Sequence, residues 1–312
     1  MRRYTSWQGL KSDDQGAVAA IGNFDGVHLG HQAILSQVQA ISDATSAPSG
    51  VITFEPHPRS FFAPASAPFR IMNPETKAHR LEKLGIERLY ELPFDGAMAA
   101  LEPHQFVADV LVKGLGLSHV IVGADFCFGK NRAGTAETLV ELGRQHGFGV
   151  TIAELVKLDA IEVSSTAIRN ALADGRPRDA AKMLGHWHRI DGQVLGGDRR
   201  GREIGYPTAN MSIQGLHAPK FGIYAVLVDV LTGPHAGHYH GAASIGVRPT
   251  FGENAPNLET FIFDFAGDLY GEELSIAFVD YLRDELKFDG IDPLVAQMDK
   301  DCAQARDLLA AL

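Results

Sequence analysis

The first half of the chain alternates short apolar runs with segments in which apolar residues recur every three or four positions. Runs of this length predict buried strands, and the periodic segments predict helices with one apolar face. Strands that alternate with helices predict a parallel, doubly wound sheet of the α/β class with helices on both faces. The expected strands are 18–21, 51–54, 89–92, 119–122 and 150–155; the expected helices begin near His31 or span 75–84, 97–101, 104–115, 135–146, 163–172 and 179–184.

The second half shows a different pattern, in which apolar and polar residues alternate in short runs between turn signals. Such runs predict antiparallel strands, and closing them into a β-barrel removes their exposed edges. A terminal helix, 293–311, is expected to pack against this barrel through Leu294, Met298, Cys302 and Ala305. The expected strands are 189–195, 221–230, 239–247, 258–265 and 274–281, and the change of pattern at 185–188 predicts two domains, 1–186 and 187–312.

Length and charge agree with this division and narrow the class of ligand. A chain of 312 residues is long enough for about two domains. Its net charge of -10 argues against nucleic-acid or acidic-membrane partners, which require a basic surface, and leaves nucleotide substrates open. Two distant cysteines and the lack of a secretory signal predict a reducing, cytoplasmic location. No apolar run is long enough to span a bilayer, and the oligomeric state is not predicted.

Two histidines lie where the strand 18–21 meets the following helix. A helix N-terminus offers free backbone N–H groups and a positive dipole end, which suit a phosphate. Gly26 and Gly30 leave room for an anion to approach the backbone. Incidental histidines in a strand–helix turn are the simpler interpretation, but the His-x-Gly-His spacing of His28 and His31 favours phosphate binding.

Other unusual segments also follow strands of the first half. The loops 23–31, 54–58 and 123–134 are expected at the carboxyl edge of the sheet, where ligands of such folds bind. Ser164, Ser165 and Thr166 open a helix that carries Arg169 one turn later. These hydroxyl groups fit either a helix N-cap or a phosphate site, and their spacing leaves both interpretations open.

The second half has its own polar candidates. Thr208 and Asn210 are two apart on an extended segment, so their side chains point the same way and offer the hard oxygens that Mg²⁺ prefers. A surface turn closed by the asparagine is the alternative. Glu259 lies in an apolar run and either faces water or, if it faces the barrel mouth, serves as a general base. The basic turn 197–202 is suited to cover phosphates.

Three other site classes fail on inspection. The segment from Gly123 to Lys130 lacks the spacing of a P-loop, and Asn131 stands where Ser or Thr would hold Mg²⁺. No G-x-G-x-x-G pattern follows the first strand, which argues against a dinucleotide-dependent oxidoreductase. His28 and His31 have no third zinc ligand nearby in the sequence.

These motifs together resemble a known family. The segment 22–31 (GNFDGVHLGH) resembles the His-x-Gly-His signature of the nucleotidylyltransferase superfamily. The ordered set over nearly the whole chain resembles the bifunctional bacterial riboflavin kinase/FAD synthetases. The segments that carry the resemblance are 22–31, 53–58, 122–129, 164–169, 205–210, 245–251 and 268–271, together with Glu259.

The resemblance implies a Rossmann-like nucleotidylyltransferase domain with a parallel sheet, followed by an antiparallel β-barrel with a terminal helix. The barrel would phosphorylate riboflavin with ATP to give FMN, and the first domain would transfer AMP from ATP to FMN, which gives FAD and pyrophosphate. The implied partners are the small molecules riboflavin, FMN and ATP, with Mg²⁺. A riboflavin kinase with an inactive first domain and a non-catalytic flavin- or nucleic-acid-binding protein remain as alternatives.

For the adenylyltransferase, the resemblance implies that the FMN phosphate attacks the α-phosphorus directly, without a side-chain nucleophile. It assigns His28, His31 and Arg169 to catalysis, through hydrogen bonds and charge at the phosphates. ATP and its phosphates would be held by Gly22, Asn23, Phe24, Asp25, Gly26, Gly30, Ser165 and Thr166, and the flavin by Phe54, Pro56, His57, Pro58, Asp125 and Phe128.

For the kinase, the resemblance implies that Glu259 takes the proton from the ribityl 5′-hydroxyl. Thr208 and Asn210 would hold Mg²⁺ between the ATP phosphates. The other expected ATP contacts are Gly197, Gly201 and Arg202, and the expected flavin contacts are Tyr281, Arg283, Glu285 and Phe288.

Overall fold

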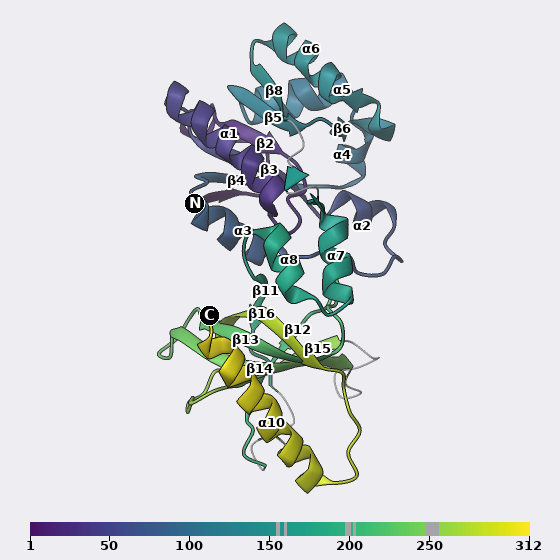
Figure 1. Cartoon of the computed structure of the whole chain (residues 1–312). Helices are drawn as coiled ribbons and strands as arrows, with labels where there is room; N and C mark the ends of the chain where they lie inside the picture. The colour runs from purple at the N-terminus through teal and green to yellow at the C-terminus, as the bar shows by residue number, and fades with distance from the viewer. Residues whose placement is uncertain (154–156, 159–160, 197–200, 202–203, 248–255) are drawn as a thin grey trace. The chain divides into compact units, whose positions relative to one another are not determined.

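A computed structural model describes the chain except residues 154–156, 159–160, 197–200, 202–203 and 248–255 (Figure 1). By their contacts, the residues divide into two compact units. The N-terminal unit comprises Met1–Ser66 and Lys77–Val163, and the C-terminal unit comprises Ala67–Thr76 and Ser164–Leu312. Within the described part of the chain, no helix combines the length and the apolar character needed to cross a membrane.

The N-terminal unit is built on a six-stranded sheet in which every neighbouring pair is parallel. All five predicted strands are confirmed; the sixth, at the sheet edge, is short, polar and was not predicted. In spatial order the strands are β1 (Arg2–Tyr4), β4 (Arg88–Pro93), β3 (Ser49–Glu55), β2 (Val18–Ile21), β5 (His119–Gly123) and β8 (Gly149–Ala153).

Burial on both faces explains why these strands read as continuous apolar runs. All four residues of β2 are buried, and so are Val51 and Ile52 of β3. The predicted helix over 104–115 is instead a short helix followed by a π-helix, and a helix at 58–62 occupies part of the expected loop. The helices are α1 (Leu29–Thr45), α2 (Pro58–Phe62), α3 (Pro74–Lys83), α4 (Gly96–Ala100), α5 (Pro103–Gln105), η2 (Phe106–Gly114) and α6 (Ala136–His146).

Several smaller elements complete the N-terminal unit. A short antiparallel pair follows β5, and a second pair lies near residue 160. None of these was predicted, because two or three residues are too few for a periodic pattern. They are η1 (Ser12–Asp14), β6 (Cys127–Phe128), η3 (Lys130–Arg132), β7 (Gly134–Thr135), β9 (Lys157–Leu158) and β10 (Ile161–Glu162).

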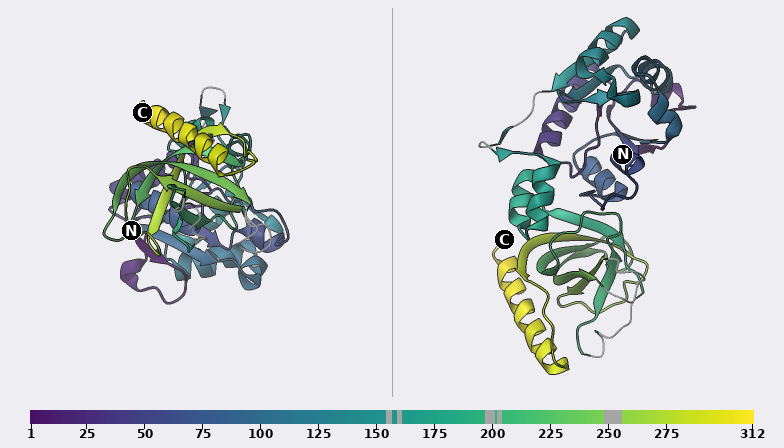
Figure 2. Two further views of the ribbon diagram at one scale, coloured as in Figure 1. Left: turned by 90° about the horizontal axis from the view of Figure 1, so that it is seen from below. Right: turned by 90° about the vertical axis from the view of Figure 1, so that its right-hand side faces the viewer.

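The C-terminal unit is built on six antiparallel strands that curl into a barrel (Figure 2). Its edge strands meet at one bridge, where the backbone N–H of Leu195 donates to the carbonyl of Asn210 at 2.8 Å. Five strands were predicted; the sixth, β12, was not. In spatial order the strands are β11 (His188–Gln193), β16 (Glu273–Arg283), β13 (Gly222–Val230), β14 (Gly237–Val247), β15 (Pro256–Ile262) and β12 (Thr208–Ser212).

Three helices accompany the barrel strands in this unit: α7 (Ser165–Ala173), α8 (Pro177–Leu184) and α10 (Ile291–Ala310). The predicted packing of the terminal helix is confirmed, because α10 lies along the outside of the barrel (Figure 2). Ala305 and Leu309 are buried there against Ala225, Ala242 and Phe263. The barrel interior holds a separate apolar core, so the outer face beside α10 is free for polar side chains.

Candidate functional sites

A strained turn follows β2 at the carboxyl edge of the N-terminal sheet. Phe24 and Val27 both have positive φ, 49° and 42°, which is unfavourable for side chains with a Cβ and most of all for a β-branched one. Both side chains are fully buried, and the Val27 N–H donates to the Phe24 carbonyl at 3.1 Å. Packing therefore holds the turn in a costly conformation, as is common where backbone must be shaped for a ligand.

The two histidines stack on each other at the start of α1. Their ring centroids are 3.6 Å apart, and Nδ1 of His28 accepts a hydrogen bond from the backbone N–H of His31 at 3.3 Å. His28 is thus the N-cap of the helix. The buried Nδ1 of His31 has no hydrogen-bond partner among the described residues. An unsatisfied polar atom at a helix N-terminus is an observation that points to a missing ligand.

Burial keeps both imidazoles neutral. It lowers the pKa of His28 to about 4. Burial is also the main reason why the pKa of His31 lies well below its ordinary value, with smaller contributions from the charges of His28 and Lys77. Because Nδ1 of neutral His28 accepts a hydrogen bond, its proton is on Nε2, and that N–H is available as a donor. Among the described residues, no group of three or more His, Cys, Asp or Glu is arranged to hold a metal ion.

Gly30 is required by the position of the His28 ring. A Cβ at residue 30 would lie 3.1 Å from Cε1 and 3.2 Å from Nδ1 of that ring. The middle glycine of the His-x-Gly-His segment therefore leaves the space that His28 occupies, in addition to any room for a ligand.

A chain of aromatic rings lies at the same edge of the sheet. Phe54 contacts Phe94 and Phe106 with centroids 5.7 and 6.4 Å apart, and Phe106 in turn contacts Phe128 at 5.7 Å. The sequence analysis identified Phe54 and Phe128 but missed the rings that join and extend them. The missed rings are Phe61, Phe62, Phe94, Phe106 and Phe126, of which Phe62 is 68% exposed at the end of α2.

The other predicted flavin contacts of this unit have local structural roles or are exposed. Nδ1 of His57 accepts from the backbone N–H of Arg59 at 3.0 Å and caps α2, with Pro56 before it and Pro58 as the first helical residue. Asp125 is exposed on the turn between β5 and β6.

The hydroxyl segment at 164–166 belongs to the C-terminal unit. Oγ of Ser164 accepts from the backbone N–H of Ala167 at 3.2 Å, which confirms the N-cap interpretation for this residue. Arg169 donates to Oγ1 of Thr166 at 3.3 Å and to the Phe69 carbonyl at 3.4 Å. Thr166 is exposed, and Ser165 and Arg169 are half-buried. The structure thus places this set in one unit and the two histidines in the other.

A cavity of about 840 Å³ lies in the C-terminal unit, on the outer face of the barrel beside α10. This volume lies within the range of small-molecule sites. Its polar residues come from neighbouring strands in register: Asn210 of β12 pairs with Glu259 of β15, which pairs with Ser244 of β14. Directly paired residues share a face, so these three side chains point to the same side. Glu259 therefore faces a cavity, although this cavity lies outside the barrel and not at its mouth.

Thr208 and Asn210 both line this cavity. The Asn210 side chain is 6% exposed; its amide donates to the Thr208 carbonyl at 3.2 Å, and its oxygen accepts from Asn257 at 3.1 Å. An amide oxygen has a second lone pair, so with the Thr208 hydroxyl it supplies the hard oxygen donors that Mg²⁺ takes. The residues present fit a magnesium ion. Gly201 also lines the cavity, whereas Gly197 and Arg202 lie outside the described residues.

The segment after β16 forms another wall of the cavity. Arg283, Glu285 and Phe288 line it as expected, whereas the described cavity lining does not include Tyr281. The Tyr281 hydroxyl bonds to the Phe221 carbonyl at 3.1 Å instead. Arg283 donates to Asp301 of α10 at 2.9 and 2.6 Å, in a two-pronged ion pair that joins the strand to the helix.

Comparison with known proteins assigns both halves of the chain. The family model for FAD synthetase matches residues 10–167, and that for riboflavin kinase matches 184–309. A bifunctional riboflavin kinase/FMN adenylyltransferase from Pseudomonas fluorescens is 41% identical over 302 residues, which cover 96% of each chain. The protein of the same name from Escherichia coli K12 is 38% identical, over 95% of this chain and 94% of that one.

A solved structure shares the fold along almost the whole chain. It is titled a macrolide-efflux protein from Streptococcus pneumoniae, with a TM-score of 0.81, 32% identity and coverage of 96% of each chain. That title gives its protein a different activity from the one that names the sequence relatives.

Proposed function

This chain belongs to the family of bifunctional riboflavin kinases/FMN adenylyltransferases, and from that premise we propose which of its residues carry out each reaction. The chain has both a FAD synthetase domain and a riboflavin kinase domain. The substrates are therefore riboflavin, FMN and ATP, and the product is FAD. The comparisons do not support the alternative of a kinase with an inactive first domain. We assign residues 1–186 to the adenylyltransferase and 187–312 to the kinase.

In the kinase, the 5′-hydroxyl oxygen of riboflavin attacks the γ-phosphorus of ATP, and the bond from that phosphorus to the oxygen of ADP breaks. Glu259 receives the hydroxyl proton. The observation that carries this assignment is the register of Glu259 with Asn210 on one wall of the cavity. When bound, Mg²⁺ neutralises phosphate charge; Thr208 and Asn210 would hold it. Arg283, Glu285 and Phe288 would contact the flavin, and Tyr281 stays a prediction.

In the adenylyltransferase, a phosphate oxygen of FMN attacks the α-phosphorus of ATP, and the bond to pyrophosphate breaks. The chain has to align two anions and stabilise the charge that develops at phosphorus. The neutral imidazoles of His28 and His31 would donate hydrogen bonds there, beside the backbone N–H groups of α1. The unpartnered Nδ1 of His31 supports this assignment. Ser165, Thr166 and Arg169 would bind the departing pyrophosphate, and the rings around Phe54 and Phe128 the flavin.

The test supplies the purified full chain with riboflavin, ATP and MgCl₂, and separates the flavins by chromatography over time. We expect FMN to appear first and FAD to follow, and no FMN to form when EDTA replaces the metal. A second reaction started from FMN isolates the adenylyl transfer. A chain that converts riboflavin to FMN but makes no FAD from either substrate would contradict the bifunctional assignment. A cytoplasmic location stays a prediction.

A further inference from the structure

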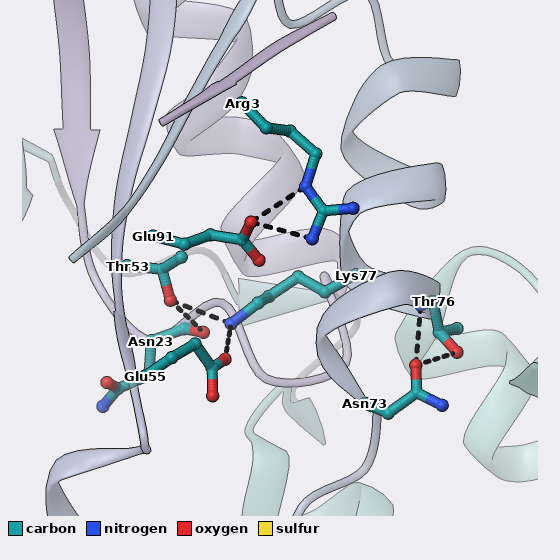
Figure 3. A network of polar contacts seen from close by, with 8 residues as sticks. All are labelled: Arg3, Asn23, Thr53, Glu55, Asn73, Thr76, Lys77 and Glu91. Carbon is teal, nitrogen blue, oxygen red and sulfur yellow. Dashed lines mark hydrogen bonds and ion pairs between the residues drawn. The ribbon is translucent and has the colours of Figure 1, made fainter. Parts of the chain in front are cut away.

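A buried lysine lies at the carboxyl end of β3 in the N-terminal unit (Figure 3). Lys77, on α3, is only 3% exposed. Its ammonium donates to Oγ1 of Thr53 at 2.9 Å and forms an ion pair with Glu55 at 3.1 Å. The Thr53 hydroxyl, fully buried, donates in turn to the backbone carbonyl of Asn23 at 3.5 Å. A chain of polar contacts therefore runs from the lysine to the first turn after β2.

Stability alone is a poor reason for a lysine at this position. Removing an ammonium and a carboxylate from water is costly, and well-packed apolar residues often replace such pairs with no loss of stability. The contacts of Lys77 are instead directed at one place. They end on Asn23, in the turn where Phe24 and Val27 hold positive φ.

The charge of Lys77 also acts on the histidine pair. The ammonium contributes to the lowered pKa of His31, together with burial and the charge of His28. A positive potential thus extends to the side chain whose Nδ1 is buried without a partner in the described part of the chain. A fixed charge in a water-poor site stabilises developing negative charge without reorganisation. The hydrogen-bond chain and the potential at His31 are separate observations that lead from Lys77 to the same turn.

We propose that Lys77 is a positioning residue for adenylyl transfer: through Thr53 it fixes the carbonyl of Asn23 and the turn that receives the ATP phosphates, and its buried charge favours anions beside His31. This inference rests on the proposed role of the N-terminal unit as the adenylyltransferase. Lys77 is not assigned a contact with substrate. Its side chain acts through Thr53 and through the field at His31.

Two substitutions separate the parts of this role. Lys77→Met removes the charge and the hydrogen bonds while keeping a long side chain. Thr53→Val removes only the link to Asn23 and leaves the ion pair with Glu55, whereas Thr53→Ser restores the hydroxyl. Arg3→Met is the matched control, because Arg3 forms the neighbouring ion pair with Glu91 at 2.8 Å and takes no part in the chain of contacts from Lys77 to Asn23 (Figure 3).

Each full-length variant is assayed for FAD formation from FMN and for FMN formation from riboflavin, and is checked for folding by thermal unfolding. We expect Lys77→Met to slow FAD formation by about 100-fold, the loss typical of a removed electrostatic group. Thr53→Val should slow it by about 10-fold, the equivalent of one hydrogen bond, and Thr53→Ser should retain most of the rate. FMN formation should stay within twofold in all variants, as should both reactions of Arg3→Met.

A second readout is the proton titration of His31, followed by NMR with the resonance assigned by His31→Gln. Lys77→Met should raise the pKa of His31, and Arg3→Met should not. If folded Lys77→Met makes FAD within threefold of Arg3→Met, the proposed role is wrong. If Lys77→Met does not fold, equal rates for Thr53→Val and Thr53→Ser overturn it. A wild-type chain that makes no FAD would instead contradict the proposed function itself.

Discussion

Titration of His28 gives a quantitative test of the stacked histidine pair. The side chain is 8% exposed, and burial lowers its pKa from 6.5 to about 4. At about 1.36 kcal/mol per pKa unit, this shift corresponds to about 3 kcal/mol in favour of the neutral ring. Between pH 6.5 and pH 4 the unfolded chain binds a proton at His28 and the folded chain does not. The His28 contribution is therefore complete above pH 6.5 and is lost as the pH falls.

The effect on stability is measurable because each unit has one tryptophan. Trp7 lies in the N-terminal unit and Trp187 in the C-terminal unit, so Trp187→Phe leaves Trp7 as the reporter of the histidine pair. Urea unfolding followed by Trp7 fluorescence should show that the change from pH 7 to pH 5 costs about 2 kcal/mol less when His28 is also replaced by Gln.

NMR checks the pKa itself, with the His28 resonance assigned by its absence in His28→Gln. We expect a midpoint near pH 4 in the free chain, and a higher midpoint with ATP, because a bound anion favours the protonated ring. A midpoint near 6.5, with the same pH dependence of unfolding in both proteins, would show that burial does not control this histidine.

Two further predictions concern packing around the sites. Gly30→Ala should slow FAD formation by about 10-fold or more without affecting FMN formation, because the new methyl group would press on the His28 ring at 3.1 Å; equal rates in both reactions would contradict this. Asp301→Ala should destabilise the C-terminal unit by about 3 kcal/mol and raise the KM for riboflavin, because it leaves Arg283 partly buried and unpaired. Asp264→Ala breaks an exposed pair and should cost less than about 1 kcal/mol in urea unfolding; similar losses in the two variants would refute the comparison.

The sequence predicted most of the fold because burial imposes a pattern on it. The strands β2 and β5 are covered on both faces and read as apolar runs, whereas the barrel strands alternate. The strand β1 (Arg2–Tyr4) was missed because its residues are polar, and β12 was missed because cavity residues interrupt its apolar pattern. The strand pattern is therefore weakest where one face serves a site or an edge.

The candidate sites divide in the same way. His28 and His31 could be identified because they are close in sequence and define a motif. Lys77 was missed because its significance depends on a contact with Thr53, 24 residues away, that no local pattern encodes. Phe62 was missed because the helix that presents it, α2, occupies an expected loop. Sequence spacing locates groups that act from one segment, and only the structure shows groups that meet from several.

The central claim is that one chain carries two separate phosphoryl-transfer sites, and Glu259→Gln tests it most directly. The amide keeps the shape of the side chain and removes its basicity, so FMN formation from riboflavin should fall by about 100-fold or more. FAD formation from FMN by the same protein should be unchanged, and Glu273→Gln, at an exposed position of β16, should leave both rates unchanged. FMN formation within threefold of the unaltered chain, or an equal loss of both reactions, would contradict the account.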